Sequence, residues 1–258
     1  MLKFGVADYG LNVRDGGLYD IERRLRDIKK LGLSGTERLE AASPSDAMWK
    51  AALYHRLGMD FSTCRGPAVQ SGMEWTAGLG KKYVWITPGS LAPELDFDTF
   101  IIRVNAFTAA AAQWGLQCGI HNHVGSRLET QAEIERYLEA CPNAGLVLDV
   151  GEIGLAGGNP AAIVKKYLKR ICAVHLKDAE IPDRKTGKIE YRALGNGEFG
   201  VINRKTLEVL IKAGYDGWVF IEPEDFRLNP LDELSNSLDY LKRGGLSIID
   251  SYSIRLKI

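Results

Sequence analysis

The most informative parts of this sequence are QCGIHNH at residues 117–123, GLVLDVGE at 145–152 and ICAVHLKD at 171–178. In each part a short apolar segment runs into His, Asp or Glu, and a later segment, WVFIE, does the same at residues 218–222. Short apolar segments bounded by turn residues are typical of strands buried on both faces of a parallel sheet. A closed parallel barrel gathers the carboxyl ends of its strands on one face, where active sites form. We therefore expect these polar residues to converge.

Eight strand–helix alternations follow one another without a break in composition, over a chain of 258 residues. This pattern and length predict a single (β/α)8 TIM-barrel domain over residues 1–258. The rival is an open doubly wound sheet, but residues 9–12 (YGLN) show no glycine-rich phosphate-binding turn after the first strand. The predicted strands cover 3–7, a segment ending near 39, 59–64, 82–87, a segment carrying both His121 and His123, 145–149, a segment ending near 177, and 218–222.

Helices are expected between these strands, where apolar residues recur at helical spacing and capping residues mark the starts. Two stretches depart from the alternation. The charged segment 179–200 is predicted to be a long loop after the seventh strand, either a binding loop or lid or a solvated excursion. The tail, 244–258, is expected to add a strand or to contact a second subunit. The predicted helices cover 18–31, 45–57, 69–79, 98–114, a segment from 130, a segment from 159, a segment after 203, and 229–241.

Composition excludes several classes of protein. The 33 Lys and Arg residues balance 33 Asp and Glu residues, so no general nucleic-acid or membrane surface is expected. No apolar run approaches the roughly 20 residues of a membrane span, and the first residues resemble a strand more than a signal peptide. The four cysteines are far apart in the sequence and form no C-x-x-C pair. This usage fits a reducing cytoplasm.

Asp149, His175 and Glu222 each lie at the end of a predicted strand. One histidine and two carboxylates suit Mn²⁺, Zn²⁺, Fe²⁺ or Co²⁺, and Mg²⁺ less well. Burying two carboxylates without a cation or a proton is costly, which favours a metal site. The fourth ligand stays open. His121 and His123 are two residues apart, so on a regular strand one is expected to bind metal and the other to act as acid or base. The alternative for His123 is a loop histidine bonded to the backbone.

The chain resembles the xylose-isomerase-like barrel superfamily over nearly its whole length. The superfamily contains sugar isomerases and epimerases, inosose dehydratases and apurinic endonucleases. The resemblance implies one divalent ion (Mn²⁺, Zn²⁺, Co²⁺ or Mg²⁺) held from strands 5 to 8, here by His121, Asp149, His175 and Glu222. The motifs that carry the resemblance are GIHNH at 119–123, LDVG at 148–151, VHLKD at 174–178, GNGE at 195–198 and IE at 221–222.

Two positions depart from the pattern of many related epimerases. Those epimerases carry Glu where His121 stands and use it with the strand-8 Glu as a pair of bases. Many also carry His where Glu152 stands, so Glu152 is interpreted as an extra ligand, an acid/base group or a sign of altered chemistry. The endonucleases need a trinuclear zinc site with more histidines than the four present here, and that function is disfavoured.

The first hypothesis is a metal-dependent isomerase or epimerase of a keto-sugar or related polyol. Glu222, His121 or His123 removes the proton next to the carbonyl, a metal-stabilised enediolate forms, and a second group, with Glu152 a candidate, returns the proton.

The alternative hypothesis is a lyase on an inosose or a 3-keto-glycoside, using the same site to expel a β-substituent. A third is a barrel subunit without catalysis. Residues expected to bind the substrate are Lys177, Arg65 and Glu37. The expected partners are a small carbohydrate or polyol and, as one outcome for the tail, a second copy in a homodimer, with neither nucleic acid nor membrane.

Overall fold

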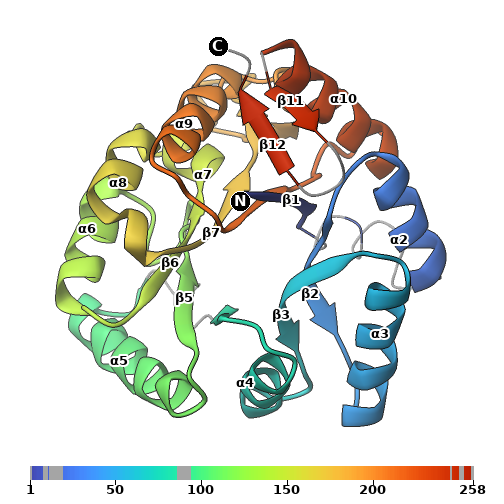
Figure 1. Ribbon diagram of the computed structural model, residues 1–258. Coiled ribbons are helices and arrows are strands. Elements are labelled where there is room, and N and C mark those ends of the chain that lie inside the picture. The colour runs from blue at the N-terminus through green and yellow to red at the C-terminus, as the bar shows by residue number, and fades with distance from the viewer. Residues whose placement is uncertain are drawn as a thin grey trace.

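Eight parallel strands form one sheet within the part of the chain that the computed structural model describes, residues 2–7, 11, 20–85 and 94–244 with the backbone of 246–249 and 253–256. The sheet order is β3-β2-β1-β10-β7-β6-β5-β4. The end strands β3 and β4 pack against each other, so the sheet is a nearly closed barrel (Figure 1). The strands are β1 (Lys3–Val6), β2 (Gly35–Glu40), β3 (Asp60–Arg65), β4 (Tyr83–Trp85), β5 (Gln117–His121), β6 (Gly145–Asp149), β7 (Ile171–Leu176) and β10 (Trp218–Ile221).

Helices surround the strands on the outside of this barrel (Figure 1). The capping residues predicted from sequence are found at the starts of three helices. Thr130 and Glu133 form a capping box, and Asn159 and Asn229 cap helices that begin with proline. The predicted TIM barrel is confirmed. The helices are α2 (Ile21–Lys30), α3 (Pro44–Arg56), α4 (Val69–Gly78), α5 (Phe97–Gln113), α6 (Gln131–Ala140), α7 (Val150–Leu155), α8 (Pro160–Tyr167), η1 (Leu168–Arg170), α9 (Gly200–Lys212) and α10 (Pro230–Arg243).

The barrel interior is packed with large side chains below the carboxyl ends of the strands. Trp218 and Phe220 stack with ring centroids 5.2 Å apart, and Tyr83 and Val147 belong to the same buried cluster. This cluster is filled by side chains, as in other barrels of this size. It forms the floor on which polar residues at the strand ends are held.

Three local predictions were wrong, and one helix was missed. The strand expected to carry both histidines ends at His121, so His123 lies in the following loop. The loop expected over 179–200 instead contains an antiparallel hairpin of β8 (Asp178–Glu180) and β9 (Glu190–Arg192). The helix expected after 203 begins at Gly200, and the short helix α7, directly after β6, was not predicted. Parts of the predicted strand 82–87 and helix 18–31 lie outside the described residues.

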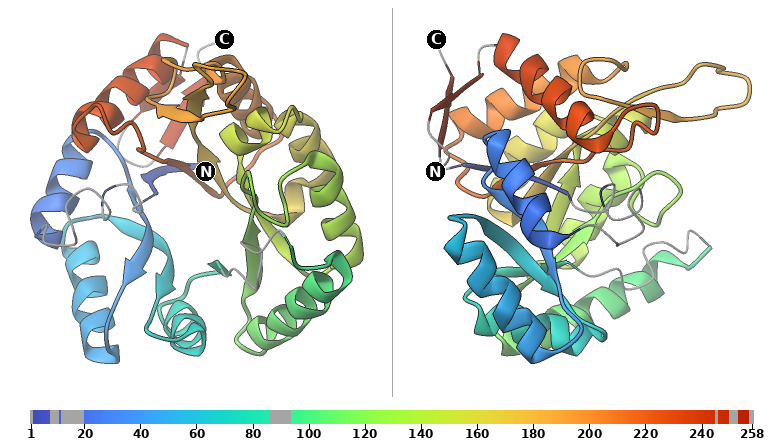
Figure 2. Two further views of the ribbon diagram at one scale, coloured as in Figure 1. Left: turned by 180° about the vertical axis from the view of Figure 1, so that it is seen from behind. Right: turned by 90° about the vertical axis from the view of Figure 1, so that its right-hand side faces the viewer.

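The two hairpins lie at opposite ends of the barrel. The tail contains β11 (Leu246–Ile249) and β12 (Ser253–Leu256), which pair with each other near the N-terminus. The β8–β9 hairpin projects from the other end (Figure 2). The expected extra strand in the tail is thus observed, whereas contact with a second subunit stays a prediction.

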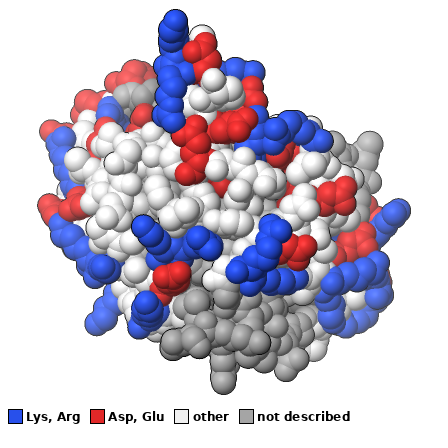
Figure 3. All heavy atoms as spheres, turned by 90° about the horizontal axis from the view of Figure 1, so that it is seen from above, with Lys and Arg blue, Asp and Glu red and all other residues white. Residues whose placement is uncertain are grey.

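The surface carries charges of both signs. On the face seen in Figure 3, basic and acidic side chains are interspersed. Among the described residues, the helices are all too short or too polar to cross a membrane.

Gly35 provides a test of how β2 is packed. A Cβ at this position would lie 1.7 Å from the carbonyl oxygen of Asp60 on β3, whereas a Cβ at Gly78 would have no neighbour within 4 Å. We expect Gly35→Ala to lower the free energy of unfolding by about 3 kcal/mol or more, because the backbone must move. Gly78→Ala should raise it by up to about 1 kcal/mol. Urea unfolding followed by circular dichroism measures both, and equal midpoints would contradict this packing.

Candidate metal centre

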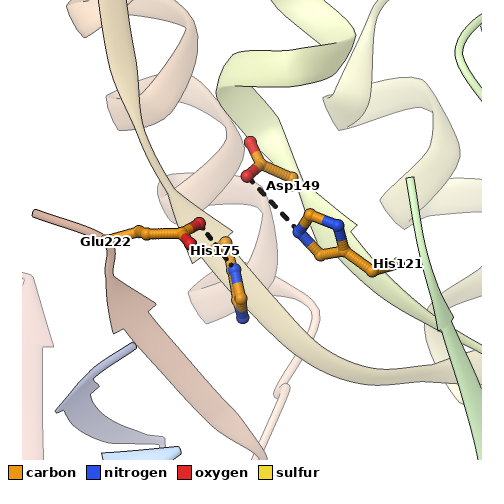
Figure 4. Close-up of side chains that lie close together, drawn as sticks. All are labelled: His121, Asp149, His175 and Glu222. Atoms are coloured by element: carbon orange, nitrogen blue, oxygen red, sulfur yellow. Dashed lines mark hydrogen bonds and ion pairs between the residues drawn. The ribbon is translucent and has the colours of Figure 1, made fainter. Parts of the chain in front are cut away.

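Four buried side chains converge at the carboxyl ends of the strands. His121 and Asp149 are the last residues of β5 and β6, His175 lies one residue before the end of β7, and Glu222 follows β10. One ligand atom from each lies within 4.8 Å of those of the others, and the side chains point toward one another (Figure 4). The strand register sets this arrangement, because Asp149 is paired with His175 across β6 and β7.

Two polar atoms in this cluster have no hydrogen-bond partner. They are His121 Nε2 and Asp149 Oδ2, which are 3.5 Å apart and buried. Buried polar atoms without partners are uncommon and call for an explanation. A divalent cation supplies one, since imidazole nitrogen and carboxylate oxygen are its usual ligands. The four residues therefore fit a metal ion.

Asp149 is held by hydrogen bonds that leave one oxygen directed at the centre. Its Oδ1 accepts the backbone N–H of Glu152 at 2.9 Å, because Asp149 caps the start of α7. Its backbone N–H donates to Asn122 Oδ1 at 2.8 Å, and its carbonyl accepts from Asn122 Nδ2 at 3.0 Å. Asn122 thus fixes the end of β6 beside the end of β5.

His175 has a carboxylate at each ring nitrogen. Nδ1 lies 3.1 Å from Glu222 Oε2, and Nε2 lies 2.8 Å from Glu37 Oε1. Burial disfavours the charged imidazolium, but these two carboxylates outweigh it and raise the pKa of His175 to about 10. Burial also opposes ionisation of Glu222, yet Lys177 and His175 hold its pKa well below the usual range. Glu37, expected to bind substrate, lies behind a proposed metal ligand.

His121 has a different environment. Its ring lies beside those of Trp85 and His175, with centroid distances of 5.0 Å and 4.9 Å. Burial is the largest effect on its pKa and lowers it, while Asp149 acts in the opposite direction. A neutral imidazole with a free lone pair is the form that binds metal.

Lys177 is surrounded by carboxylates. Its buried Nζ lies 3.0 Å from Glu222, 3.2 Å from Glu224, 3.3 Å from Glu152 and 3.5 Å from Asp149. Burial opposes its charge, but these groups raise the pKa of Lys177 well above its ordinary value. An ammonium group has three N–H donors, so the carboxylates can engage all of them. The arrangement assigns Lys177 to holding these groups in place, and a direct role in substrate binding stays a prediction.

Glu152 and His123 form a pair beside the cluster. His123 Nδ1 lies 2.6 Å from the carbonyl oxygen of Val124, so Nδ1 carries the proton and Nε2 faces Glu152 Oε1 at 3.4 Å. The backbone bond considered for His123 is therefore present. Its side chain is 38% exposed, which leaves it accessible to a ligand. Glu152 also accepts hydrogen bonds from the Val124 N–H and from the hydroxyl of Tyr191.

Sequence reasoning missed two residues of this network. Glu224 follows the proposed ligand Glu222 by two residues, and burial, helped by Glu222, raises its pKa to about 7 against the opposing effect of Lys177. Tyr191 comes from β9, and its ring lies 4.9 Å from Lys177 Nζ. The acidic pair at 222 and 224 was a usable signal for Glu224, whereas nothing local marked Tyr191.

Arg65, expected to bind substrate, lies at the end of β3. Its side chain is 61% exposed and pairs with Glu40 at 3.3 Å. Its role stays a prediction.

The family of the chain follows from comparison with known proteins. Residues 68–244 match the family described as xylose isomerase-like TIM barrel, which is more than half of the chain. The chain belongs to this family. The resemblance inferred from the sequence motifs is thereby confirmed.

The chain is similar in sequence to two curated proteins and in structure to two solved proteins. An inosose dehydratase of Bacillus thuringiensis (strain Al Hakam) is 35% identical over 126 residues, 44% of this chain and 42% of that relative. The rhizopine catabolism protein MocC of Rhizobium meliloti is 25% identical over 252 residues, 81% of this chain and 76% of MocC.

A solved structure of the IOLI protein with a bound zinc atom has a TM-score of 0.67 and 17% identity, and the match covers 93% of this chain and 98% of that one. The match to the inosose dehydratase of Bacillus thuringiensis spans less than half the length of that relative. A solved structure of a 3-keto-D-glucoside 4-epimerase from E. coli has a TM-score of 0.69 and 16% identity, and the match covers 94% of this chain and 100% of that one, which shows a shared fold.

The β8–β9 hairpin that carries Tyr191 is anchored by Asp178. This buried carboxylate accepts backbone N–H groups from Ala179 and Phe199 on Oδ1, and from Gly195 and Gly197 on Oδ2. A Cβ at Gly197 would lie 2.5 Å from Asp178 Oδ1, so the loop fits closely around the carboxylate. Asp178, the last residue of the VHLKD motif, thus links the strand of His175 to the hairpin.

Removal of this anchor should loosen the hairpin. We expect Asp178→Ala to lower the free energy of unfolding by about 3 kcal/mol, because several buried N–H groups lose their acceptor. Trypsin should then cleave faster near Arg184, Lys185 and Lys188, which lie between the two hairpin strands. Asp183→Ala, within the same turn, is the control and should leave global stability nearly unchanged. Unaltered cleavage and stability in Asp178→Ala would contradict the anchoring role.

Proposed function

We propose that this chain is a divalent-metal-dependent carbon–oxygen lyase that dehydrates a keto-polyol of the inosose class. The observation that carries the proposal is the buried cluster of His121, Asp149, His175 and Glu222, with the partly exposed His123 and its buried partner Glu152 beside it. The cluster provides a place for a cation, and the pair provides an imidazole, the side chain most often used for general acid–base catalysis.

The four clustered residues would hold the cation, which would act as a Lewis acid on a carbonyl and an adjacent hydroxyl of the substrate. The two carboxylates would neutralise its charge, and the two imidazoles would complete a mixed nitrogen and oxygen ligand set. The identity of the ion, among Mn²⁺, Zn²⁺, Co²⁺ and Mg²⁺, is part of what the experiment determines.

His123 is the group assigned to proton transfer. Its Nε2 takes the proton from the carbon next to the carbonyl, and the C–H electrons form a carbon–carbon double bond. The C–O bond to the β-hydroxyl then breaks, and His123 returns the proton to the leaving oxygen, so that water and an unsaturated ketone result. Glu152 faces the same nitrogen, and Lys177 and Tyr191 hold Glu152 in place.

The relatives support this choice of substrate class. Inosose dehydratases recur among them, at 29–36% identity over about half of this chain or more. The two-glutamate arrangement expected of epimerases needs a glutamate at the end of β5, where this chain has His121. These two points favour loss of water over simple movement of a proton.

Epimerisation or isomerisation of a keto-sugar is the second candidate function. It is favoured by proton-transfer groups that come from different parts of the barrel, His123 after β5 and Glu224 after β10. A proton removed by one group could be returned by the other, and no C–O bond would then break.

The test is turnover of 2-keto-myo-inositol by protein supplied with Mn²⁺, Zn²⁺ or Co²⁺. We expect a product lighter by one water, with new ultraviolet absorbance from the conjugated ketone. His123→Gln should reduce kcat by about 100-fold or more, in line with the loss of a general acid–base group. His55→Gln, on the exposed side of α3, is the matched control and should be unaffected.

Mass spectrometry in deuterated water separates the candidates. Deuterium uptake without loss of water would favour the isomerase or epimerase over the lyase. Full activity in His123→Gln would contradict the assignment of proton transfer to that residue.

A further inference from the structure

Glu37 reaches across the barrel interior. It lies within β2, which is separated from β7 in the sheet by β1 and β10. Its Oε1 nevertheless lies 2.8 Å from Nε2 of His175, and both side chains are fully buried. The other carboxylate oxygen, Oε2, has no hydrogen-bond partner. The His175 imidazole is therefore the one hydrogen-bond partner that the described structure gives to this carboxylate.

The two nitrogens of His175 have separate tasks in this geometry. Metal binding requires His175 to lose a proton, and the neutral imidazole carries one N–H while its second nitrogen has a lone pair. If Nε2–H donates to Glu37, the lone pair belongs to Nδ1, which faces the cluster 3.1 Å from Glu222 Oε2. The edge-on rings of Trp85 and Phe220, at centroid distances of 5.7 Å and 6.0 Å, restrict rotation of the imidazole.

We propose that Glu37 is a positioning residue of the metal centre, which sets the tautomer of His175 and strengthens its Nδ1 as a ligand. A carboxylate that accepts the second N–H of a metal-bound histidine fixes the ring and raises the basicity of the ligating nitrogen. This inference rests on the metal centre of the proposed function. It assigns Glu37 to the support of a ligand, with no contact to the cation or substrate.

The surroundings of Glu37 favour this role over substrate binding. The His175 ring lies between its carboxylate and Glu222, and the side chain has no exposed surface. Ser62 fixes the backbone at this point, since its hydroxyl donates to the Glu37 carbonyl oxygen at 2.7 Å and lies 2.8 Å from the hydroxyl of Tyr83. The carboxylate is thus held at one position relative to the imidazole.

The experiment compares Glu37→Gln with the wild type by competition with a chelator for Zn²⁺ and Co²⁺. Gln keeps the size of the side chain but removes its charge, so we expect affinity to fall by about 10- to 100-fold. Glu40→Gln is the matched control, because it makes the same substitution at the exposed last residue of β2, which pairs with Arg65 and not with His175, and its affinity should stay within about threefold. Thermal unfolding of each metal-free variant checks that the barrel is intact.

A second readout reports on the ligand itself. In ¹H–¹⁵N spectra of the zinc-loaded wild type, we expect His175 to carry its proton on Nε2 and to bind the ion through Nδ1. The visible spectrum of the Co²⁺ form should change in Glu37→Gln and should be unchanged in Glu40→Gln. The wild-type NMR measurement decides the tautomer even if Glu37→Gln does not fold.

The outcomes separate this inference from the proposed function. Wild-type protein that binds neither ion would overturn both. Wild-type protein that binds metal, with equal affinity in Glu37→Gln or with zinc on Nε2, would overturn the role of Glu37 and leave the metal centre standing.

Discussion

Two carboxylates buried at the mouth of a barrel require nearby positive charge, and the rest of the site depends on this constraint. Asp149 and Glu222 are removed from water by the surrounding strands, and the desolvation of an uncompensated carboxylate costs several kcal/mol. Lys177 and His175 supply compensation inside the protein, because the ammonium contacts both carboxylates and the imidazole faces Glu222. A divalent cation would supply the remainder and would engage Asp149 Oδ2 and His121 Nε2, which have no hydrogen-bond partner.

Further charged side chains surround this centre and contact its residues. Glu37 stands behind His175, and Lys177 connects the cluster to Glu152 and Glu224. Glu152 in turn faces the accessible His123 and accepts from Tyr191, which the β8–β9 hairpin brings over the site. The floor of aromatic and aliphatic side chains keeps these groups at the carboxyl ends of the strands. The barrel therefore presents the partly exposed His123 beside a buried, highly charged centre, which suits the acid–base chemistry that we propose.

The convergence of the four ligand-type residues could be predicted from sequence, because each follows a recognisable apolar strand and strand ends meet in a parallel barrel. The role of Glu37 could not, since it depends on which side chain lies across the barrel interior from β2. The position of His123 was predicted from regular strand geometry. Strand β5 ends two residues earlier, at His121, so His123 lies in the following loop. Tyr191 was hidden in a charged segment whose hairpin depends on the tertiary anchor at Asp178.

The most direct measurement is the metal content of the purified protein, determined by inductively coupled plasma mass spectrometry after equilibration with Mn²⁺, Zn²⁺ or Co²⁺ and removal of the excess. The account predicts about one ion per chain in the wild type. It predicts almost none in Asp149→Asn, whose carboxylate oxygen is lost from the centre, and the wild-type amount in Asp98→Asn, an exposed carboxylate on α5. A wild-type protein without metal, or an Asp149→Asn variant that keeps its ion, would contradict the claim that these buried residues form a metal centre.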